Sequence, residues 1–375
     1  MVAAMLGGCG SLSVGPDYQT PELAMPSDWS VPLSKDELRA PKAARHLAQW
    51  WRQFQDPQLD KLVDEALAGS LDLRLAQARL RQARASRSQA ISGLFPTVTA
   101  STGGTRSSSA NAISPTTART IYDAGFDAAW EIDIFGGTRR SIEAASADQQ
   151  SSEASLHNTR VSLVAEVAQN YIELRAYQQR LEIARKNLAS QTETLQITEW
   201  RYQAGLVSSS DVEQARTNRE QTRASIPDLD VGLAAAENRL AVLLGKNPGS
   251  LHQQLKESKP LPALPVSVAA GIPSDVLRQR PDLIASERTL AAETARVGQK
   301  LAKRFPSLNL SGSFGWQAYS YGALGAAGTL ARAVTGTLAA TLFDGGNLRS
   351  AVEIQSAVQE QALVTYQKNV LLALE

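Results

Sequence analysis

Three carboxylates, Asp127, Glu131 and Asp133, are spaced so that they could act together. The positions between and beside them are apolar: Phe126, Ala128, Trp130, Ile132 and Ile134. Strict alternation places the two sets on opposite faces of a β-strand. Acidic side chains around a water-filled pore favour the passage of cations. We therefore expect Asp127, Glu131 and Asp133 to face an aqueous lumen, with the apolar residues facing away from it.

A catalytic centre has no support in the sequence. The histidines His46, His157 and His252 are scattered, and no two of them have the spacing of metal ligands. No phosphate-binding loop or nucleophile elbow is present. The arginine-rich run 74–87 could suit nucleic acid, but 38 Lys and Arg balance 37 Asp and Glu, which favours a solvated helix face. We expect no enzyme activity, no cofactor, no bound metal and no nucleic acid partner.

The single cysteine, Cys9, is a candidate for lipid attachment. The run Leu6-Gly7-Gly8-Cys9 is similar to a bacterial lipobox, in which a signal peptide is cleaved before a cysteine that then carries lipid. Prolines recur in the residues after it and predict an extended tether. We interpret 1–9 as a signal-peptide remnant and 10–47 as a proline-rich tether. The alternative is an incidental cysteine in a frayed tail.

The turn within "RYQAGLVSSSDVEQA" is the remaining candidate site. Gly205 is placed to end one helix in a left-handed conformation. Ser210 and Glu213 have the spacing of a capping box that would open the next helix. This chemistry explains the turn without any partner. It leaves unexplained the apolar residues Leu206 and Val207, which lie where solvent is expected.

An internal duplication positions these candidate sites. Residues 67–96 match 277–306 at a shift of 210 without a gap, and both segments end in Phe-Pro. The run "GGTRRS" at 136–141 matches "GGNLRS" at 345–350 at a shift of 209. Each copy reads as helix, strand, strand and long helix. The predicted organisation is a first repeat at 48–250, a linker at 251–272 and a second repeat at 273–375.

Four stretches alternate between apolar and polar residues, two in each repeat. They lie at 97–106, 121–135, 307–319 and 332–343. Each is about ten residues long, the length of a tilted strand that crosses a bilayer. Four half-buried strands of a soluble sheet are the alternative. The recurrence of polar residues on one face of all four strands favours the wall of a barrel.

A long helical hairpin is predicted at 138–245. From Thr138 to Ala204 there is neither Gly nor Pro over 67 residues, which at 1.5 Å per residue would reach about 100 Å. Apolar residues recur every seven positions, as in a coiled coil: Val167, Leu174, Leu181, Leu188, Leu195 and Tyr202. A rod-like coiled-coil dimer is the alternative, but it leaves the strands unexplained.

These elements predict an α+β membrane protein that must oligomerise. Open strand edges do not occur in lipid, so a membrane sheet must close. Four strands cannot close alone, because bacterial barrels start at about eight strands. A dimer, trimer or tetramer would supply eight, twelve or sixteen strands, and only the larger barrels enclose water. The expected architecture is a pore continued by long coiled-coil helices.

The sequence resembles the TolC-like outer-membrane efflux factors, in the lipoprotein subgroup often labelled NodT or OprM-like. The matching stretches are "VGPDYQTPE", "WWRQFQDPQLDKLVDEAL", "RYQAGLVSSSDVEQAR", "SIPDLDVGLAAAENRLAVLLGKNPG", "IPSDVLRQRPDLIASERTLAAETARVG" and "FPSLNLSGSFG". Together they span nearly the whole chain, and their combination is specific to this family.

The resemblance implies a homotrimer in the outer membrane, with a 12-stranded β-barrel continued by a helical barrel through the periplasm. It implies an exit duct of a tripartite pump that exports drugs, solvents or metal ions, with a periplasmic adaptor, an inner-membrane RND-type transporter and outer-membrane lipid as partners. It also implies that the adaptor docks at the turn between the two long helices. The contact residues carried over are Arg201, Tyr202, Gly205, Leu206, Val207, Ser210, Asp211 and Val212.

The second repeat is shorter than the first. Residue 375 corresponds to Glu166, so the counterpart of the first long hairpin is incomplete in this sequence. We expect a C-terminally truncated second repeat, and the gating residues that the family carries there cannot be assigned. A non-conducting coiled-coil lipoprotein or adhesin stalk is the competing function. The acidic strand face distinguishes the two, because a stalk needs no wet lumen.

Overall fold

The computed structural model describes residues 13–22, 49–111, 114–263 and 279–374. Cys9, most of the predicted tether and part of the predicted linker lie outside the described residues. The chain forms two compact units. Unit 1 comprises Met1–Ala24, Arg79–Ala154 and Pro281–Glu375, and unit 2 comprises Met25–Ala78 and Ser155–Arg280. Both predicted repeats therefore contribute strands to unit 1, whereas unit 2 derives mainly from the first repeat.

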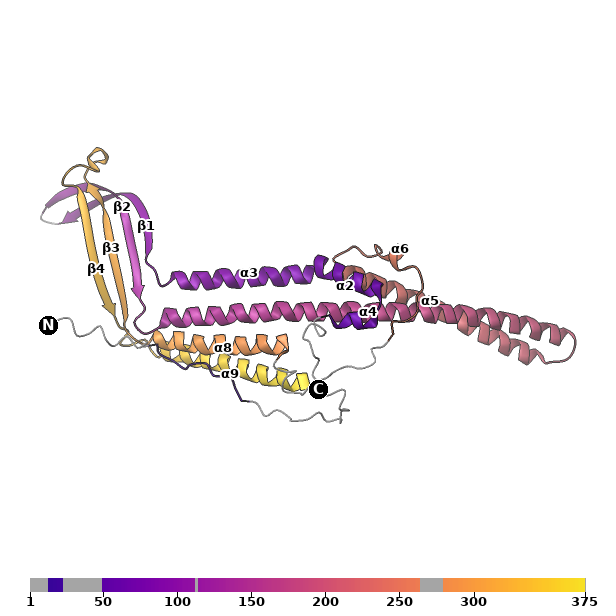
Figure 1. The fold of residues 1–375 in the computed structure, drawn as a ribbon. Coiled ribbons are helices and arrows are strands. Elements are labelled where there is room, and N and C mark those ends of the chain that lie inside the picture. Colours follow the sequence, from indigo (N-terminus) through magenta and orange to yellow (C-terminus); the bar gives the residue numbers. More distant parts are fainter. Residues whose placement is uncertain (1–12, 23–48, 112–113, 264–278, 375) are drawn as a thin grey trace. The chain divides into compact units, whose positions relative to one another are not determined.

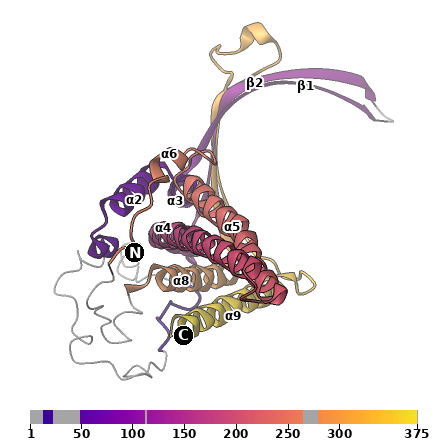
Figure 2. The same ribbon diagram turned by 90° about the vertical axis from the view of Figure 1, so that its right-hand side faces the viewer.

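Unit 1 contains a four-stranded sheet with the order β1-β2-β3-β4, and every pair in it is antiparallel (Figure 1). The strands are β1 (Thr97–Asn111), β2 (Ser114–Ile132), β3 (Ser307–Ala318) and β4 (Leu330–Ala339). β1 and β2 have 15 and 19 residues, which is longer than the ten expected, and Figure 2 shows them as a bent ribbon. A short 3-10 turn, η2 (Tyr321–Ala323), lies between β3 and β4.

Helices precede and follow each strand pair of unit 1, and the first two of these helices have residues in both units. They are α3 (Leu71–Ser92) before β1, α4 (Gly137–Gln203) after β2, α8 (Pro281–Ala302) before β3 and α9 (Asn347–Leu374) after β4. α8 contacts α9 through Gln355 Nε2, which donates to Glu293 Oε2 at 2.6 Å. Arg87 Nε of α3 donates to Ser146 Oγ of α4 at 3.0 Å. The order helix, strand, strand, helix thus recurs in both repeats.

Unit 2 contains an antiparallel hairpin of α4 and α5 (Ser209–Leu243), shown in Figure 1. Most of the predicted heptad seam is buried: Val167, Leu174, Leu181 and Leu195. Leu188 is half-buried, and Tyr202 at the end of the seam is exposed. The seven-residue spacing therefore identified the packed face of α4 as far as Leu195.

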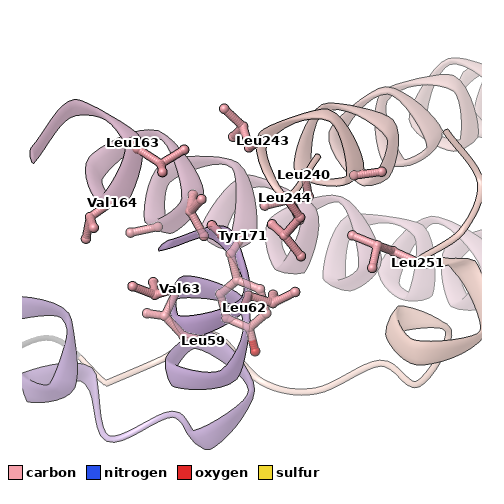
Figure 3. Packing of buried hydrophobic residues seen from close by; sticks show 14 of the residues in the cluster. Leu59, Leu62, Val63, Leu163, Val164, Tyr171, Leu240, Leu243, Leu244 and Leu251 are labelled. Atoms are coloured by element: carbon pink, nitrogen blue, oxygen red, sulfur yellow. The ribbon is translucent and has the colours of Figure 1, made fainter. Parts of the chain in front are cut away.

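The base of this hairpin holds the main hydrophobic core of unit 2. α2 (Pro57–Gly69), which follows the 3-10 turn η1 (Trp50–Phe54), packs its apolar face on α4 and α5 (Figure 3). Tyr171 on α4 is fully buried, and its hydroxyl donates to Asp56 Oδ2 at 2.6 Å. Asp56 also caps α2. The buried Arg175 donates to the carbonyl of Glu257 at 2.7 Å, just after α6 (His252–Leu255).

Candidate functional site

The strand register gives the sheet of unit 1 one apolar and one polar face. Phe126 of β2 lies opposite Phe314 of β3, and Leu308 of β3 lies opposite Leu338 of β4. Because side chains alternate along each strand, the apolar residues of all four strands gather on one face. They are Val98, Ala100, Phe126, Ala128, Trp130, Leu308, Leu310, Phe314, Trp316, Leu330, Val334 and Leu338, with Arg332 as a charged exception.

Much of this apolar face is exposed within the described chain. Val334 is 82% exposed and Leu338 is 69% exposed. An exposed apolar patch of this kind is unfavourable in water and marks a surface that contacts lipid or protein. The paired strands thus give this face the character expected of a barrel exterior.

The opposite face of the sheet carries polar and acidic side chains. Asp127 lies opposite Ser313, and Glu131 lies opposite Asn309. Ser101 Oγ of β1 donates to Asp127 Oδ2 at 3.0 Å. The register therefore brings Asp127 and Glu131 onto one face with hydroxyl and amide groups: Thr97, Thr99, Ser101, Asn309, Ser311, Ser313, Gln317, Thr335 and Thr337.

Asp133 does not belong to this polar face, which corrects part of the strand expected at 121–135. β2 ends at Ile132, and the Asp133 carboxylate accepts hydrogen bonds from the backbone N–H groups of Thr138 and Arg139 at 3.1 and 2.9 Å. Arg139 Nε also donates to it at 3.1 Å. A carboxylate at a helix N-terminus satisfies N–H groups that lack partners within the helix. Asp133 therefore fixes the start of α4.

Asp344 plays the same part in the second repeat. Its carboxylate accepts hydrogen bonds from the backbone N–H groups of Gly346 and Leu348 at 2.8 and 2.7 Å. The bonds from Leu348 and Gly346 lower the pKa of Asp344. The two strand-to-helix junctions thus use the same aspartate chemistry, although only the glycines of the "GG" pairs had identified them in the sequence.

Aromatic side chains gather at both ends of the strands. At the end near η2, the Arg119 guanidinium lies 4.2 Å from the ring centroid of Tyr319, and Tyr122 contacts Tyr321 edge to face. At the helix end, Phe135 stacks on Phe305, with 4.8 Å between ring centroids. Tyrosine and tryptophan are favoured at the two interfaces of a membrane.

An extended N-terminal segment, Ser13–Thr20, packs on the junction between β2 and α4. Val14 N donates to the carbonyl of Phe135 at 3.1 Å. The Arg140 side chain is only 5% exposed, and it donates to the carbonyls of Val14 and Gly15 and to Asp17 Oδ1, the last at 2.8 Å. Burial lowers the pKa of Arg140, but hydrogen bonds to Glu143 and Asp17 outweigh it and raise the pKa.

The far end of the same segment binds α8. The Tyr18 hydroxyl donates to Glu287 Oε1 at 2.9 Å, and burial together with this bond raises the pKa of Tyr18 to about 12. Arg288 lies over the Tyr18 ring, 5.5 Å from its centroid. Sequence reasoning missed this site, because Arg140 and Asp17 are 123 positions apart. The only available clue was the motif "VGPDYQTPE", which carried no spacing to Arg140.

The turn between α4 and α5 is built as expected at its start. Gly205 has a φ of 73°, the left-handed conformation that ends α4. Leu206 is 73% exposed at the tip, and Arg201 and Tyr202 are exposed beside it. The residues expected to contact a partner are therefore partly at the surface.

The capping box differs from the predicted one. The N-cap of α5 is Ser208, two residues before Ser210, and its partner is Asp211 instead of Glu213. Asp211 N donates to Ser208 Oγ at 3.3 Å, and Ser208 N donates to Asp211 Oδ2 at 2.8 Å. These bonds from the side chain and backbone of Ser208 lower the pKa of Asp211. Because three serines are consecutive, the sequence was compatible with an N-cap at Ser208 or at Ser210. α5 therefore begins earlier than expected.

Two apolar residues of the tip point differently from the prediction. Val207 is half-buried in a groove between α4 and α5, which is also lined by Thr198 and Gln214. Val212 is 7% exposed, so it packs inside the hairpin. Leu206 alone of the three apolar residues presents most of its surface to solvent.

The described residues include no group of three or more His, Cys, Asp or Glu that could hold a metal ion. None of the described helices is both long and apolar enough to span a membrane.

An exposed apolar sheet face, a polar opposite face and long antiparallel helices define a membrane-associated sheet-and-helix protein. The chain belongs to the outer membrane efflux protein family, whose sequence pattern matches residues 62–246 and 272–375. It is therefore an outer-membrane component of an efflux system. Members of this family are transport proteins, not enzymes.

Relatives with known names agree with this assignment. The chain is 31% identical to nodulation protein T of Rhizobium leguminosarum bv. trifolii over 376 residues, which cover 99% of this chain and 78% of the relative. It is 33% identical to the pyoverdine export outer membrane protein OpmQ of Pseudomonas aeruginosa, over 98% of this chain and 77% of the relative. The solved outer-membrane channel OprN superposes with a TM-score of 0.87 at 37% identity, over 96% of this chain and 80% of OprN.

Proposed function

We propose that three copies of the chain form a 12-stranded barrel that acts as the exit duct of a tripartite efflux pump. The observation that carries this proposal is the two-faced sheet. Its apolar face suits lipid, while Asp127 and Glu131 on the other face suit a water-filled lumen.

The sheet edges support the oligomer. Within the described residues β1 pairs only with β2 and β4 pairs only with β3, so each has one unpaired edge. Unpaired strand edges are not tolerated in lipid. Three copies of the four-stranded sheet would give twelve strands and close every edge, because β4 of one copy can pair antiparallel with β1 of the next.

The helical hairpin supports a docking partner. Leu206 presents an exposed apolar side chain at the turn, between a left-handed glycine and a capping box that hold the backbone in place. A periplasmic adaptor would cover it and link the duct to an inner-membrane RND-type transporter. The partner contact would include Arg201, Tyr202, Gly205, Leu206, Val207, Ser210, Asp211 and Val212, the last two chiefly by holding the turn.

The transported compounds are small molecules. The relative OpmQ is named for pyoverdine export, and a passive duct of this kind needs no binding pocket for its cargo. Drugs, solvents and metal ions remain compatible with a lumen lined by acidic and hydroxyl side chains.

Cys9 would anchor the chain to the membrane through attached lipid. Stable anchoring takes more than one acyl chain, as lipoproteins provide. With a complete signal peptide supplied, Cys9→Ala should abolish labelling by a fatty-acid probe, whereas Arg349→Ala should label normally. Persistent labelling of the Cys9 variant would place the lipid elsewhere.

Conductance in planar bilayers tests the duct. The purified protein should give discrete ion-conducting steps. A protein that forms trimers in detergent but gives no steps would favour the competing function, a non-conducting coiled-coil stalk.

A further inference from the structure

Within one chain, the two repeats meet where the end of β2 lies beside the start of β3, and we call this contact the internal junction. The ring of Phe135, three residues after β2, stacks on that of Phe305, two residues before β3. Their planes are 21° apart. Beside them Gly137 approaches α8 closely, since a Cβ placed on it would lie 3.2 Å from Ala302 Cβ. An aromatic stack and a glycine contact thus connect this pair of strand ends.

The duplication repeats two of the four residues of this junction at the outer edges of the unit. Phe95 corresponds to Phe305 at the 210 shift and also lies two residues before its strand. Gly346 corresponds to Gly137 at the 209 shift, but Gly137 is the first residue of α4, whereas Gly346 precedes α9 with a φ of 91°. At the same shift the counterpart of Phe135 is Asp344, and Phe343 is the residue just before it.

The residues at the outer strand edges are largely exposed in the described chain. Phe343 is 92% exposed and Phe95 is 64% exposed. Apart from Gly346 itself and its two neighbours in the chain, no heavy atom of the described residues lies within 4 Å of a Cβ placed on Gly346. One chain therefore carries an exposed phenylalanine at the β4 edge and another at the β1 edge, and neither has a partner like that of Phe135 within the described residues.

We propose that Phe343 of one copy stacks on Phe95 of the next copy and that Gly346 packs against Ser92 beside it. The proposal rests on the trimer proposed above. When β4 pairs antiparallel with β1 of a neighbouring copy, it repeats the pairing of β2 with β3. That pairing sets the end of β4 beside the residues before β1, as the end of β2 is set beside Phe305.

We assign a second copy of the chain as the partner that covers Phe343 and Phe95. The internal contact between Phe135 and Phe305 is the model for this contact between copies. Lipid could also cover two isolated phenylalanines at a membrane interface. Gly346 has a left-handed φ of 91°, which by itself favours glycine there. Lipid would not explain why one exposed phenylalanine follows β4 and another precedes β1, at the two strand ends that a neighbouring copy would bring together. Ser92, the counterpart of Ala302, is small enough for the same approach.

Site-directed crosslinking of the whole protein in detergent and in outer-membrane vesicles tests the pair. We expect the double variant Phe95→Cys with Phe343→Cys to form covalent trimers with a short bis-maleimide reagent. Either cysteine alone should give no trimer. The matched control is Phe95→Cys with Val334→Cys, since Val334 is also exposed but lies in the middle of β4.

A photoreactive side chain covers the case in which the cysteine variants fail to fold. Benzoylphenylalanine in place of Phe343 retains an aromatic ring and should capture a peptide that contains Phe95 of another copy. Trimers that persist while the probe captures only lipid, or another segment, would overturn this contact and leave the proposed duct intact. Absence of any oligomer, for the parent protein as well, would overturn the trimer and the contact together.

Discussion

Phe126 of β2 lies directly opposite Phe314 of β3, and about half of each side chain is exposed, 53% and 49%. The two residues come from different repeats, yet they lie on the same face. The apolar surface therefore continues across the boundary between the repeats. A continuous exposed apolar face over four strands indicates one surface designed for one environment, which in an outer-membrane protein is lipid.

The acidic residues of the opposite face should influence ion selectivity. We expect the double variant Asp127→Asn with Glu131→Gln to reduce the cation preference of the channel, because carboxylates at a lumen surface attract cations. Reversal potentials in a salt gradient measure this preference. Folding should be little affected, since both residues lie on a solvated face.

Asp133→Asn is the contrasting variant. Asp133 accepts bonds from the start of α4 and does not lie on the strand. Asparagine keeps one acceptor oxygen but loses the ion pair with Arg139, so this variant should lower stability by less than the roughly 0.5–2 kcal/mol that replacing a capping side chain by alanine costs. Thermal unfolding measures that loss. Should Asp133→Asn alter selectivity as strongly as the double variant, the carboxylates would act by long-range charge and not by lining the lumen.

Arg140 should hold the N-terminal segment on the helices. Arg140→Ala removes its bonds to Val14, Gly15 and Asp17, and bonds to charged groups are worth about 1.5–3 kcal/mol. We expect protease cleavage within 13–20 to become faster while the sheet stays folded. The matched control is Arg349→Ala, the counterpart in the second repeat, whose side chain is exposed on α9. Equal cleavage of both variants would show that Tyr18 and Glu287 suffice.

Replacing Leu206 at the tip by a charged residue should weaken binding of the adaptor. We expect Leu206→Asp to weaken adaptor binding by about 1–3 kcal/mol, typical of losing a buried interface anchor. Co-purification with the cognate adaptor measures binding, and a thermal melt should be unchanged because Leu206 is 73% exposed. Val231→Asp is the control, since Val231 is similarly exposed on α5 but away from the turn. Full recovery of adaptor with the Leu206 variant would make this turn purely structural.

The capping box at the start of α5 should respond to acid. The pKa of Asp211 is lowered in the folded chain, so its contribution to stability is fully present above its unfolded pKa of about 3.9 and is lost as the pH falls through the folded value. We expect hydrogen exchange at 206–212, corrected for intrinsic rates, to accelerate below about pH 4. Asp211→Ala, which removes the acceptor oxygens, should exchange fast at every pH. An Asp211 variant that keeps the acid transition would assign it to another group.

The sequence predicted the elements better than their pairing. Alternation identified all four strands, and the absence of Gly and Pro from 138–204 identified α4 almost to the residue. Register requires knowledge of which residues oppose each other, so the match of Phe126 with Phe314 could not be read from either strand alone. The same limit hid the bond between Arg140 and Asp17.

The first residues of helices were also hard to predict from the sequence, because a short polar residue at any of several positions can cap a helix. Ser208, Ser209 and Ser210 are chemically equivalent in sequence, and in the structure Ser208 is the N-cap of α5 because it pairs reciprocally with Asp211. Asp133 had the alternation of a strand residue, but the backbone N–H groups of α4 compete for its carboxylate. Local patterns of two and seven residues were reliable where no such competition arose.

Alternate cysteines along β3 test the central claim, that the polar face of the sheet meets water and the apolar face meets lipid. Single variants Leu310→Cys, Ser311→Cys, Gly312→Cys, Ser313→Cys and Phe314→Cys would be treated with a water-soluble maleimide in outer-membrane vesicles, with the parent protein as the background for Cys9. We expect labelling at 311 and 313 and protection at 310, 312 and 314, because successive β3 side chains point to opposite faces. Uniform labelling, or protection at 311 and 313 with labelling at 310 and 314, would contradict the account.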